Sequence, residues 1–319
     1  MMKKGIIAIA VILIAAGIIC FVYPLITSNF DLSMLGTAKY ETNTYTVSQK
    51  FDHIEIHSVE TDILLAPAAD NKVSIVCMER DKVRHQVTVE KGTLMITADD
   101  QRDWMDRLTF FTKSLTMTVY LPAESYQSLT IDSRTGKVTV PSSFSFGSID
   151  ITSGTGKIIC SASADGAFKA KAGTGDIVLN GVKAKSFDLS ATTGDIEVIS
   201  AACADHITIT VSTGKIKLTD TLCKSLHVSG STGRMTLGNT VASDDFDLTM
   251  STGDVFFENC DAGSITVNTT TGDVRGSLRS AKVFIAKAST GKISVPDTVT
   301  GGKCEITTTT GNIEISLVQ

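Results

Sequence analysis

"TTTTGNIEI" closes the chain at Thr307–Ile315, and its central phrase, Thr-Gly followed by one polar and one apolar residue, has by then occurred nine times. The glycines of these ten phrases are always 19 or 20 residues apart. So regular a period is typical of a solenoid, in which each unit buries its apolar face against its neighbours. The repeated glycines are Gly136, Gly156, Gly175, Gly194, Gly214, Gly233, Gly253, Gly272, Gly291 and Gly311.

The residues around each glycine alternate between apolar and polar. The second residue after it is Val, Ile or Met in all ten repeats, and a similar alternating segment starts about twelve residues later. A period of two indicates strands, and the frame of leucine-rich repeats is absent. We therefore predict an all-β fold, a parallel β-solenoid of about ten coils of 19–20 residues. It should be right-handed, because parallel crossovers nearly always are.

The Thr-Gly pair itself is interpreted as a structural corner. Glycine permits the left-handed backbone that a sharp bend requires. The preceding threonine can bond to backbone at the turn and stack on the threonines of adjacent coils. The ten corners thus predict architecture, with no direct role in binding or catalysis.

The N-terminus predicts a membrane anchor. Residues 1–27 contain an uncharged apolar run from Gly5 to about Ile26, preceded by Lys3 and Lys4. This is about the length that a hydrocarbon core requires, and an A-x-A-like cleavage site is missing. We expect one uncleaved transmembrane helix, a cytoplasmic N-terminus and an extracytoplasmic remainder. The predicted localisation is the cell membrane, single-pass.

Three further segments follow this anchor. Residues 28–44 are predicted to be a juxtamembrane linker, residues 45–132 an irregular N-terminal β module that caps the solenoid, and residues 133–319 the solenoid repeats. Within the module, Trp104, Leu108 and Phe111 share one helical face, which predicts a short capping helix or a packed loop.

Several phrases of the module and the repeats after them resemble one bacterial family. They are "FDHIEI" at Phe51–Ile56, "DILLAPAADNKVSI" at Asp62–Ile75 and "VYLPAESYQSLTI" at Val119–Ile131. Together they are similar to the bacterial putative-adhesin family, a β-strand-repeat domain of unknown function also described as toast-rack-like. The resemblance implies a right-handed parallel β-helix, commonly behind a membrane anchor, with a role in adhesion or envelope stress. It supplies no catalytic residues.

Charge and cysteine content exclude some classes of function. The chain has 29 Lys and Arg against 34 Asp and Glu, and two of the lysines belong to the predicted anchor. Nucleic acid is therefore not an expected partner, since binding to phosphates relies on clustered Lys and Arg. The seven cysteines show no C-x-x-C spacing. Cys203 and Cys223 share one position in successive coils, where either a disulfide or two free thiols would fit.

The residue after each glycine forms an exposed ladder of charges. Opposite signs are expected in neighbouring coils at Lys157–Asp176, Asp195–Lys215, Arg234–Asp254 and Asp273–Lys292. The acidic neighbours Asp176 with Asp195, and Asp254 with Asp273, are weak candidates for Ca²⁺ ligands. The preferred interpretation is a solvated ladder that fixes coil register, with no metal and no cofactor.

No catalytic residues are predicted. His53 and His57 lie on one strand face, His85 stands alone, and His206 and His227 occupy different positions of the repeat. Neither a three-ligand metal site nor a nucleophile with its base can be assembled from these residues.

The function predicted from these features is that of a non-enzymatic, membrane-anchored surface protein. It would contact an envelope protein or glycan in adhesion or envelope-stress sensing. A β-helix polysaccharide lyase or hydrolase is the alternative from another class, although aromatic platforms for sugars are hard to find among the core positions. A purely structural surface scaffold is the third.

Overall fold

The computed structural model describes residues 39–103 and 114–318, together with six single positions between residues 14 and 26. Most of the predicted anchor, most of the linker and the predicted helix around Trp104 lie outside the described residues. Among the residues that are described, no helix is long and apolar enough to cross a membrane.

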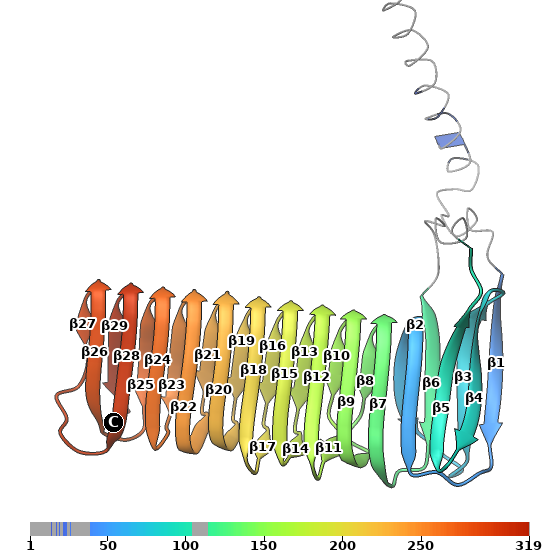
Figure 1. The fold of residues 1–319 in the computed structure, drawn as a ribbon, viewed down its shortest axis with the longest axis horizontal. Coiled ribbons are helices and arrows are strands. Elements are labelled where there is room, and N and C mark those ends of the chain that lie inside the picture. Colours follow the sequence, from blue (N-terminus) through green and yellow to red (C-terminus); the bar gives the residue numbers. More distant parts are fainter. Residues whose placement is uncertain are drawn as a thin grey trace, which may run out of the picture.

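The described part of the chain is a row of stacked β coils (Figure 1). Each coil contributes one strand before its Thr-Gly corner and one after it, and the two sets form two facing sheets of parallel strands. The pre-corner strands are β7 (Ser125–Thr135), β9 (Ser145–Thr155), β12 (Ala167–Thr174), β15 (Ser186–Thr193), β18 (His206–Thr213), β20 (Leu222–Thr232), β22 (Val241–Thr252), β24 (Ser264–Thr271), β26 (Lys282–Thr290) and β28 (Gly302–Thr310).

The post-corner strands are shorter. They are β8 (Val138–Val140), β10 (Ile158–Cys160), β13 (Ile177–Asn180), β16 (Ile196–Ile199), β19 (Ile216–Thr219), β21 (Met235–Gly238), β23 (Val255–Cys260), β25 (Val274–Leu278), β27 (Ile293–Ser294) and β29 (Ile313–Leu317). Three two-residue strands lie at the opposite bend, namely β11 (Ser163–Ala164), β14 (Lys183–Ala184) and β17 (Ala202–Cys203).

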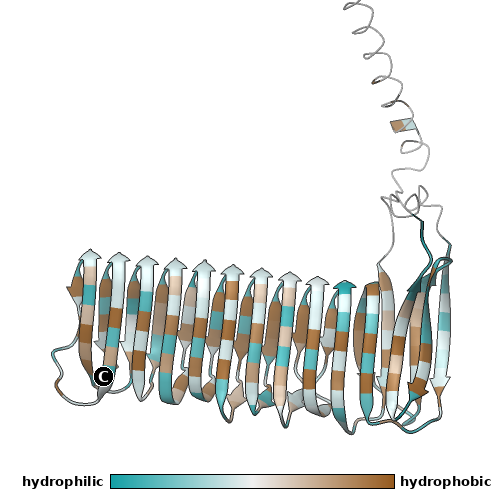
Figure 2. Ribbon diagram, viewed as in Figure 1, coloured by the Kyte–Doolittle hydropathy of each residue, from teal (hydrophilic) through white to brown (hydrophobic). Residues whose placement is uncertain are grey.

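The core lies between the two sheets, where alternate residues of every coil point inward. Phe168 and Phe187 occupy the same position in adjacent coils, are fully buried, and have ring centroids 5.4 Å apart. Figure 2 shows the resulting bands of apolar residues running along the row of strands. Burial of each such side chain stabilises the fold by about 1.5–3 kcal/mol. Only the stacking of neighbouring coils provides this burial.

The Thr-Gly corners are sharp because the glycines adopt φ values between +130° and +154°. Gly253 illustrates a second restriction, since a Cβ there would overlap the carbonyl oxygen of Gly233 in the preceding coil. The threonines before the glycines stack in register, as Thr174 does with Thr193. The corner therefore has a backbone that L side chains rarely adopt and no room for a methyl group.

The N-terminal module extends both sheets. It contains β1 (Tyr40–Val47), β2 (His53–Pro67), β3 (Val73–Arg80), β4 (Val83–Glu90), β5 (Thr93–Asp100) and β6 (Leu115–Leu121). The long strand β2 forms a coil of its own, because it pairs in parallel with β7 through its first half and with β8 through its second. The boundary predicted between residues 132 and 133 thus falls inside β7, which already has the register of a coil.

The corner of the β2 coil is held by charges. Glu60 takes the position that Thr135 has in the next coil. Its carboxylate lies 3.0 Å from Arg80 and 2.6 Å from Arg102. Beyond β2, strands β5 and β4 continue one sheet and strands β6, β3 and β1 continue the other. The first coil is therefore covered rather than left as an open edge.

The order of the last coils differs from their order in the sequence. Strand β28 pairs with β24 on one side and with β26 on the other, and β29 lies between β25 and β27. The C-terminal coil is thus inserted before the coil that precedes it in the chain (Figure 1). The prediction that Asp273 and Lys292 are neighbours is therefore wrong, since Asn312 lies between them.

Pro296 gives a physical reason for this order. It comes two residues after the end of the two-residue strand β27. Because proline has no N–H to donate to a neighbouring strand, this coil suits the end of a sheet. The inserted coil has the complete strand β29, and its core residues Ile306 and Ile313 are fully buried. In the terminal coil, Phe284 is only partly buried.

Candidate functional site

The residue after each corner glycine forms a ladder along one edge of the coils, as expected. Its acidic members accept hydrogen bonds from the backbone of the next coil. Asp195 Oδ1 accepts from the amide of Lys215 at 2.7 Å, and Asp62 of the β2 coil accepts from that of Lys137 at 2.7 Å. Asn312 does the same for Lys292 at 2.9 Å. These side chains satisfy amides that the bend leaves without a strand partner.

The four Ca²⁺ candidates lie in this ladder. Asp176 and Asp195 are in adjacent coils, as are Asp254 and Asp273, and in each pair the first carboxylate accepts from the amide of the second. The other oxygen of Asp176 lies 3.3 Å from Lys157 Nζ. The structure brings each pair together, but backbone amides and the side chains of Lys157, Arg234 and Arg275 already contact their oxygens. A calcium role for these residues stays a weak prediction.

Two adjoining shallow pockets lie on the post-corner face near the C-terminal end, and together we call them the Phe256 groove. Its larger part, of about 900 Å³, lies over β23, β25, β29 and β27, and a second part of about 420 Å³ lies toward β21. Phe256 and Arg275 line both parts. Gly276, without a side chain, lies in its floor. The groove therefore spans the outer surfaces of several successive coils.

Phe256 is the distinctive side chain of this groove. It is 41% exposed, and no other aromatic ring between residues 133 and 318, all of which are described, is so exposed. It is the third residue after Gly253, a position that alternation directs outward, next to the buried Phe257. The expectation that aromatic residues occupy core positions does not hold for Phe256. Counting positions from the glycine would have found it.

Charges of both signs surround the ring. Arg275 lies 2.8 Å from Asp273 and 3.4 Å from Glu314, and Arg234 lies 3.5 Å from Asp254. All of these residues line the groove. The result is an apolar surface bordered by hydrogen-bond donors and acceptors, as in sites for neutral polar ligands.

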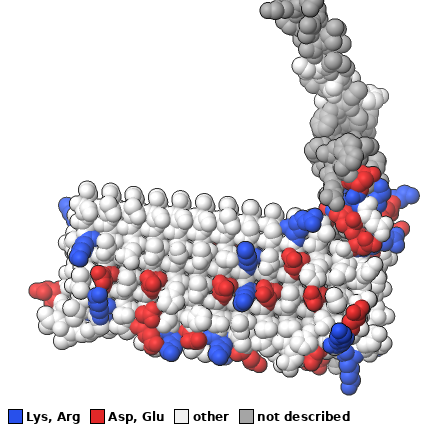
Figure 3. All heavy atoms as spheres, viewed as in Figure 1, with Lys and Arg blue, Asp and Glu red and all other residues white. Residues whose placement is uncertain are grey.

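One broad face of the solenoid carries no comparable cluster of charged residues. Figure 3 shows Lys and Arg interspersed with Asp and Glu among uncharged residues on the repeats of this face. A mixed surface of this kind offers no large field of one sign on this face.

A buried polar cluster lies in the N-terminal module. Glu79 accepts hydrogen bonds from His85 Nδ1 at 2.9 Å, from the His85 amide at 2.7 Å and from Asn43 at 2.6 Å. Cys77 lies beside them, and the donor atoms of Cys77, Glu79 and His85 are within 4.8 Å of one another. The expectation that His85 stands alone is therefore wrong. Two facing strands bring these residues together, and no pattern in the sequence reveals this.

Burial shapes the electrostatics of this cluster. It raises the pKa of the Cys77 thiol to about 12, with help from the Glu79 charge. Burial also raises the pKa of Glu79, but the hydrogen bonds from Asn43 and His85 outweigh it, so this pKa is lowered overall. The pKa of His85 is lowered by burial, which the nearby Glu79 opposes.

The remaining histidines have separate partners. His53 bonds Ser128 at 2.7 Å, and His57 lies 2.6 Å from Glu55. His206 lies 3.3 Å from Asp205, and His227 lies 3.9 Å from Asp245. None of these described residues joins a group of three metal-ligating side chains.

Cys203 and Cys223 occupy neighbouring coils, as predicted, and both are free thiols. The sulfur of Cys203 donates to the carbonyl oxygens of Lys185 and His206, and that of Cys223 donates to Val241. Both side chains are buried and fill space that alanine has in other coils, such as Ala184 and Ala242.

Comparison with known proteins identifies one family. The model described as Toastrack DUF4097 matches residues 51–222 and again residues 200–319. No curated protein matches the chain.

Several solved structures are similar at low identity. A putative adhesin from Bacteroides fragilis NCTC 9343 is 13% identical, with 87% of this chain and 97% of that chain covered and a TM-score of 0.43. A putative adhesin from Parabacteroides distasonis ATCC 8503 is 12% identical, with 88% and 98% covered and a TM-score of 0.49. A putative lipid binding protein from the same organism is 14% identical, with 88% and 98% covered and a TM-score of 0.48.

Proposed function

This chain belongs to the Toastrack DUF4097 family, and from that premise we propose that it is a non-enzymatic, membrane-anchored binding protein that holds an envelope glycan in its Phe256 groove. The family is a domain of unknown function, so the proposal rests on this chain's own residues. The observation that carries it is the exposed ring of Phe256 among paired arginine and carboxylate groups.

The N-terminal residues support an extracytoplasmic position at the membrane. The apolar run from Gly5 to Ile26 has the length of a membrane span, and Lys3 and Lys4 precede it. Positive residues favour the cytoplasmic side, which leaves the solenoid outside the cell. There it would meet the glycans and proteins of the envelope.

The chemistry of the groove suits a sugar chain. A flat aromatic ring can remove the C–H face of a sugar from water, a gain that depends on apolar area. Arg275 and Arg234 have guanidinium N–H groups for ring hydroxyls, and Asp273 and Glu314 have acceptor oxygens. A groove that crosses several coils would accommodate several units of a linear glycan.

The same groups fit binding better than cleavage. Glycoside hydrolysis uses two carboxyl groups, of which one must stay protonated as a general acid. In this groove Asp254, Asp273 and Glu314 each lie within 3.5 Å of a guanidinium nitrogen. Paired in this way, they are placed as fixed hydrogen-bond acceptors. The proposed function therefore includes no reaction step.

The test uses the full chain, purified in mild detergent, with purified envelope glycans and with solubilised envelope proteins. Saturable retention of a glycan whose length is unchanged after incubation supports the proposal. Shortened sugar would instead establish the lyase or hydrolase alternative. Capture of one envelope protein without glycan binding would contradict the glycan assignment, and failure to bind either would favour a structural scaffold.

A further inference from the structure

We propose that the N-terminal module contains a site for one divalent transition-metal ion, best matched to Zn²⁺, with Cys77, Glu79 and His85 as its protein ligands. This site is separate from the Phe256 groove, which lies near the opposite end of the solenoid. It is not needed for the proposed function.

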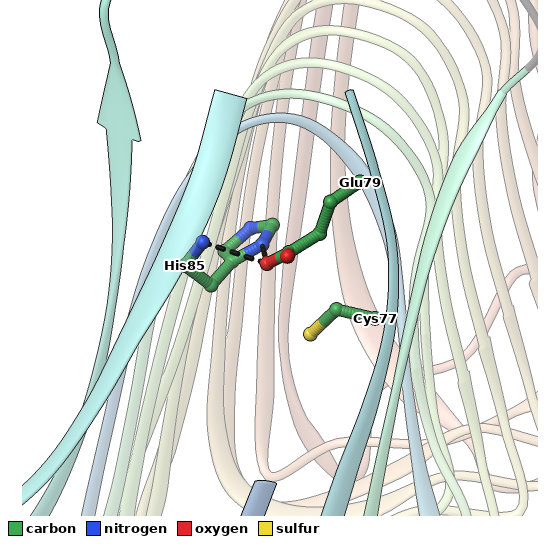
Figure 4. Close-up of side chains that lie close together, drawn as sticks. All are labelled: Cys77, Glu79 and His85. Atoms are coloured by element: carbon green, nitrogen blue, oxygen red, sulfur yellow. Dashed lines mark hydrogen bonds and ion pairs between the residues drawn. The ribbon is translucent and has the colours of Figure 1, made fainter. Parts of the chain in front are cut away.

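The fold brings the three side chains together from two directions. Cys77 and Glu79 are two residues apart on β3, so they point to the same side of that strand. His85 lies on β4, which pairs with β5 in the other sheet. Figure 4 shows the imidazole of His85 directed toward Glu79 across the interior, with Cys77 on the same side. The site thus lies between the sheets, beside the first coil.

The donor atoms are those that zinc uses. A sulfur, a carboxylate oxygen and an imidazole nitrogen lie within 4.8 Å of one another. In a tetrahedral zinc site with bonds of about 2.0–2.3 Å, neighbouring ligand atoms are about 3.5 Å apart. Small side-chain rotations would therefore complete the first three positions. A water molecule could take the fourth.

An unpartnered buried atom points independently to a ligand. His85 is 3% exposed, and its Nε2 has no hydrogen-bond partner. A buried polar nitrogen without a partner loses the hydrogen bond that it would make with water in the unfolded chain. A metal ion bound by Nε2 would give this nitrogen a partner, while Nδ1 keeps its hydrogen bond to Glu79.

Charge balance supports a cation at this position. Glu79 is 1% exposed, and among the ion pairs of the described residues its partner is His85, not a lysine or arginine. A buried carboxylate is costly without a compensating positive charge. A divalent ion would supply it, and the Cys77 thiol would release its proton to solvent when its sulfur binds the metal.

Outer residues already orient the carboxylate. Asn43 donates to Glu79 Oε2 at 2.6 Å, and the Tyr45 hydroxyl donates to the same carboxylate at 3.2 Å. Both come from the edge strand β1, which pairs with β3. Such second contacts fix ligand orientation in metal sites. A bound ion would then join β3 to β4 and tie the two sheets together at the start of the solenoid.

The test is Co²⁺ binding to the full, chelator-treated chain, because Co²⁺ reports its ligands by absorption. We expect one Co²⁺ per chain, with a sulfur-to-metal charge-transfer band in the near ultraviolet and the intense visible bands of tetrahedral coordination. Cys77→Ser should abolish the charge-transfer band, and His85→Gln should weaken binding at least tenfold. Cys304→Ser, which changes another fully buried cysteine, is the matched control and should keep both.

A measurement on the unaltered chain covers the case in which a variant fails to fold. Zn²⁺ should raise the thermal unfolding midpoint of the chelator-treated chain, and a chelator should reverse that rise. The proposal is overturned if Co²⁺ binding is not stoichiometric, if the charge-transfer band survives Cys77→Ser, or if Zn²⁺ leaves the midpoint of the unaltered chain unchanged.

Discussion

The backbone amide of Asn312 donates to Oδ1 of Asp273 at 2.6 Å, although 39 residues separate the two. Elsewhere in the repeats the same contact joins residues 19 or 20 apart, as between Asp254 and Asp273 or Asp195 and Lys215. One coil has therefore been skipped. The C-terminal coil lies inside the stack, and the coil of β26 and β27 forms its end.

Engineered disulfides should report this order. Thr307 on β28 is paired with Asn268 on β24 and with Lys287 on β26. Because paired strands are about 4.8 Å apart, Asn268→Cys with Thr307→Cys should oxidise readily. Asn268→Cys with Lys287→Cys should not, because two strand spacings of about 10 Å exceed the reach of a disulfide. Non-reducing mass spectrometry distinguishes them, and the reverse pattern would restore the sequence order of the coils.

A methyl group at a Thr-Gly corner should destabilise the fold. Gly253 has a φ of +140°, and a Cβ there would overlap the carbonyl oxygen of Gly233. We expect Gly253→Ala to lower the free energy of unfolding by at least about 2 kcal/mol. Gly238→Ala is the control, since its Cβ would meet nothing closer than 3.9 Å. Denaturant midpoints compare them, and equal effects would mean that the corner does not restrict the backbone.

The carboxylates of the ladder should act through backbone amides. Asp195→Ala removes the acceptor of the Lys215 amide and should cost about 0.5–1.5 kcal/mol. Asp195→Asn should cost much less, because Asn312 already makes the equivalent bond to Lys292. Thermal unfolding of both variants gives the comparison. If the asparagine variant lost as much as the alanine variant, the charge rather than the hydrogen bond would matter.

Cys203 and Cys223 should be free thiols that react slowly in the folded chain. Cys203 and Cys223 are free and buried, and burial raises the pKa of Cys223 to about 12. Since the thiolate is the reactive form, alkylation at pH 8 should be slow in the folded chain and fast in denaturant. Mass spectrometry without reductant should then find both cysteines alkylated. Protection that persists in denaturant until a reductant is added would indicate a disulfide.

Most of the fold followed from periodicity. The alternation after each glycine predicts inward residues such as Ile177 and outward ones such as Asp176, because a strand has a period of two whatever its partners are. The order of the last coils could not follow in this way. Periodicity gives the position of a residue within a coil, and Asn312 has the same position whether its coil lies inside the stack or at the end.

The two candidate sites also differ in whether the sequence could predict them. Phe256 was within reach of sequence reasoning, since its distance from Gly253 directs it outward. The cluster at Cys77 was not, because Glu79 and His85 meet where β3 and β4, after pairing at Arg80 and Val83, diverge into opposite sheets. The antiparallel strands of the N-terminal module have no sequence repeat from which this side-chain contact could be predicted.

The glycan role of the Phe256 groove is the central claim, and one pair of variants tests it most directly. Leu222 is another exposed apolar side chain, 56% exposed, and does not line the groove. Affinity for the envelope glycan should be measured by calorimetry for the unaltered full chain, Phe256→Ala and Leu222→Ala. The account predicts a loss of at least tenfold for Phe256→Ala and none for Leu222→Ala. Equal affinity of Phe256→Ala and the unaltered chain would contradict it.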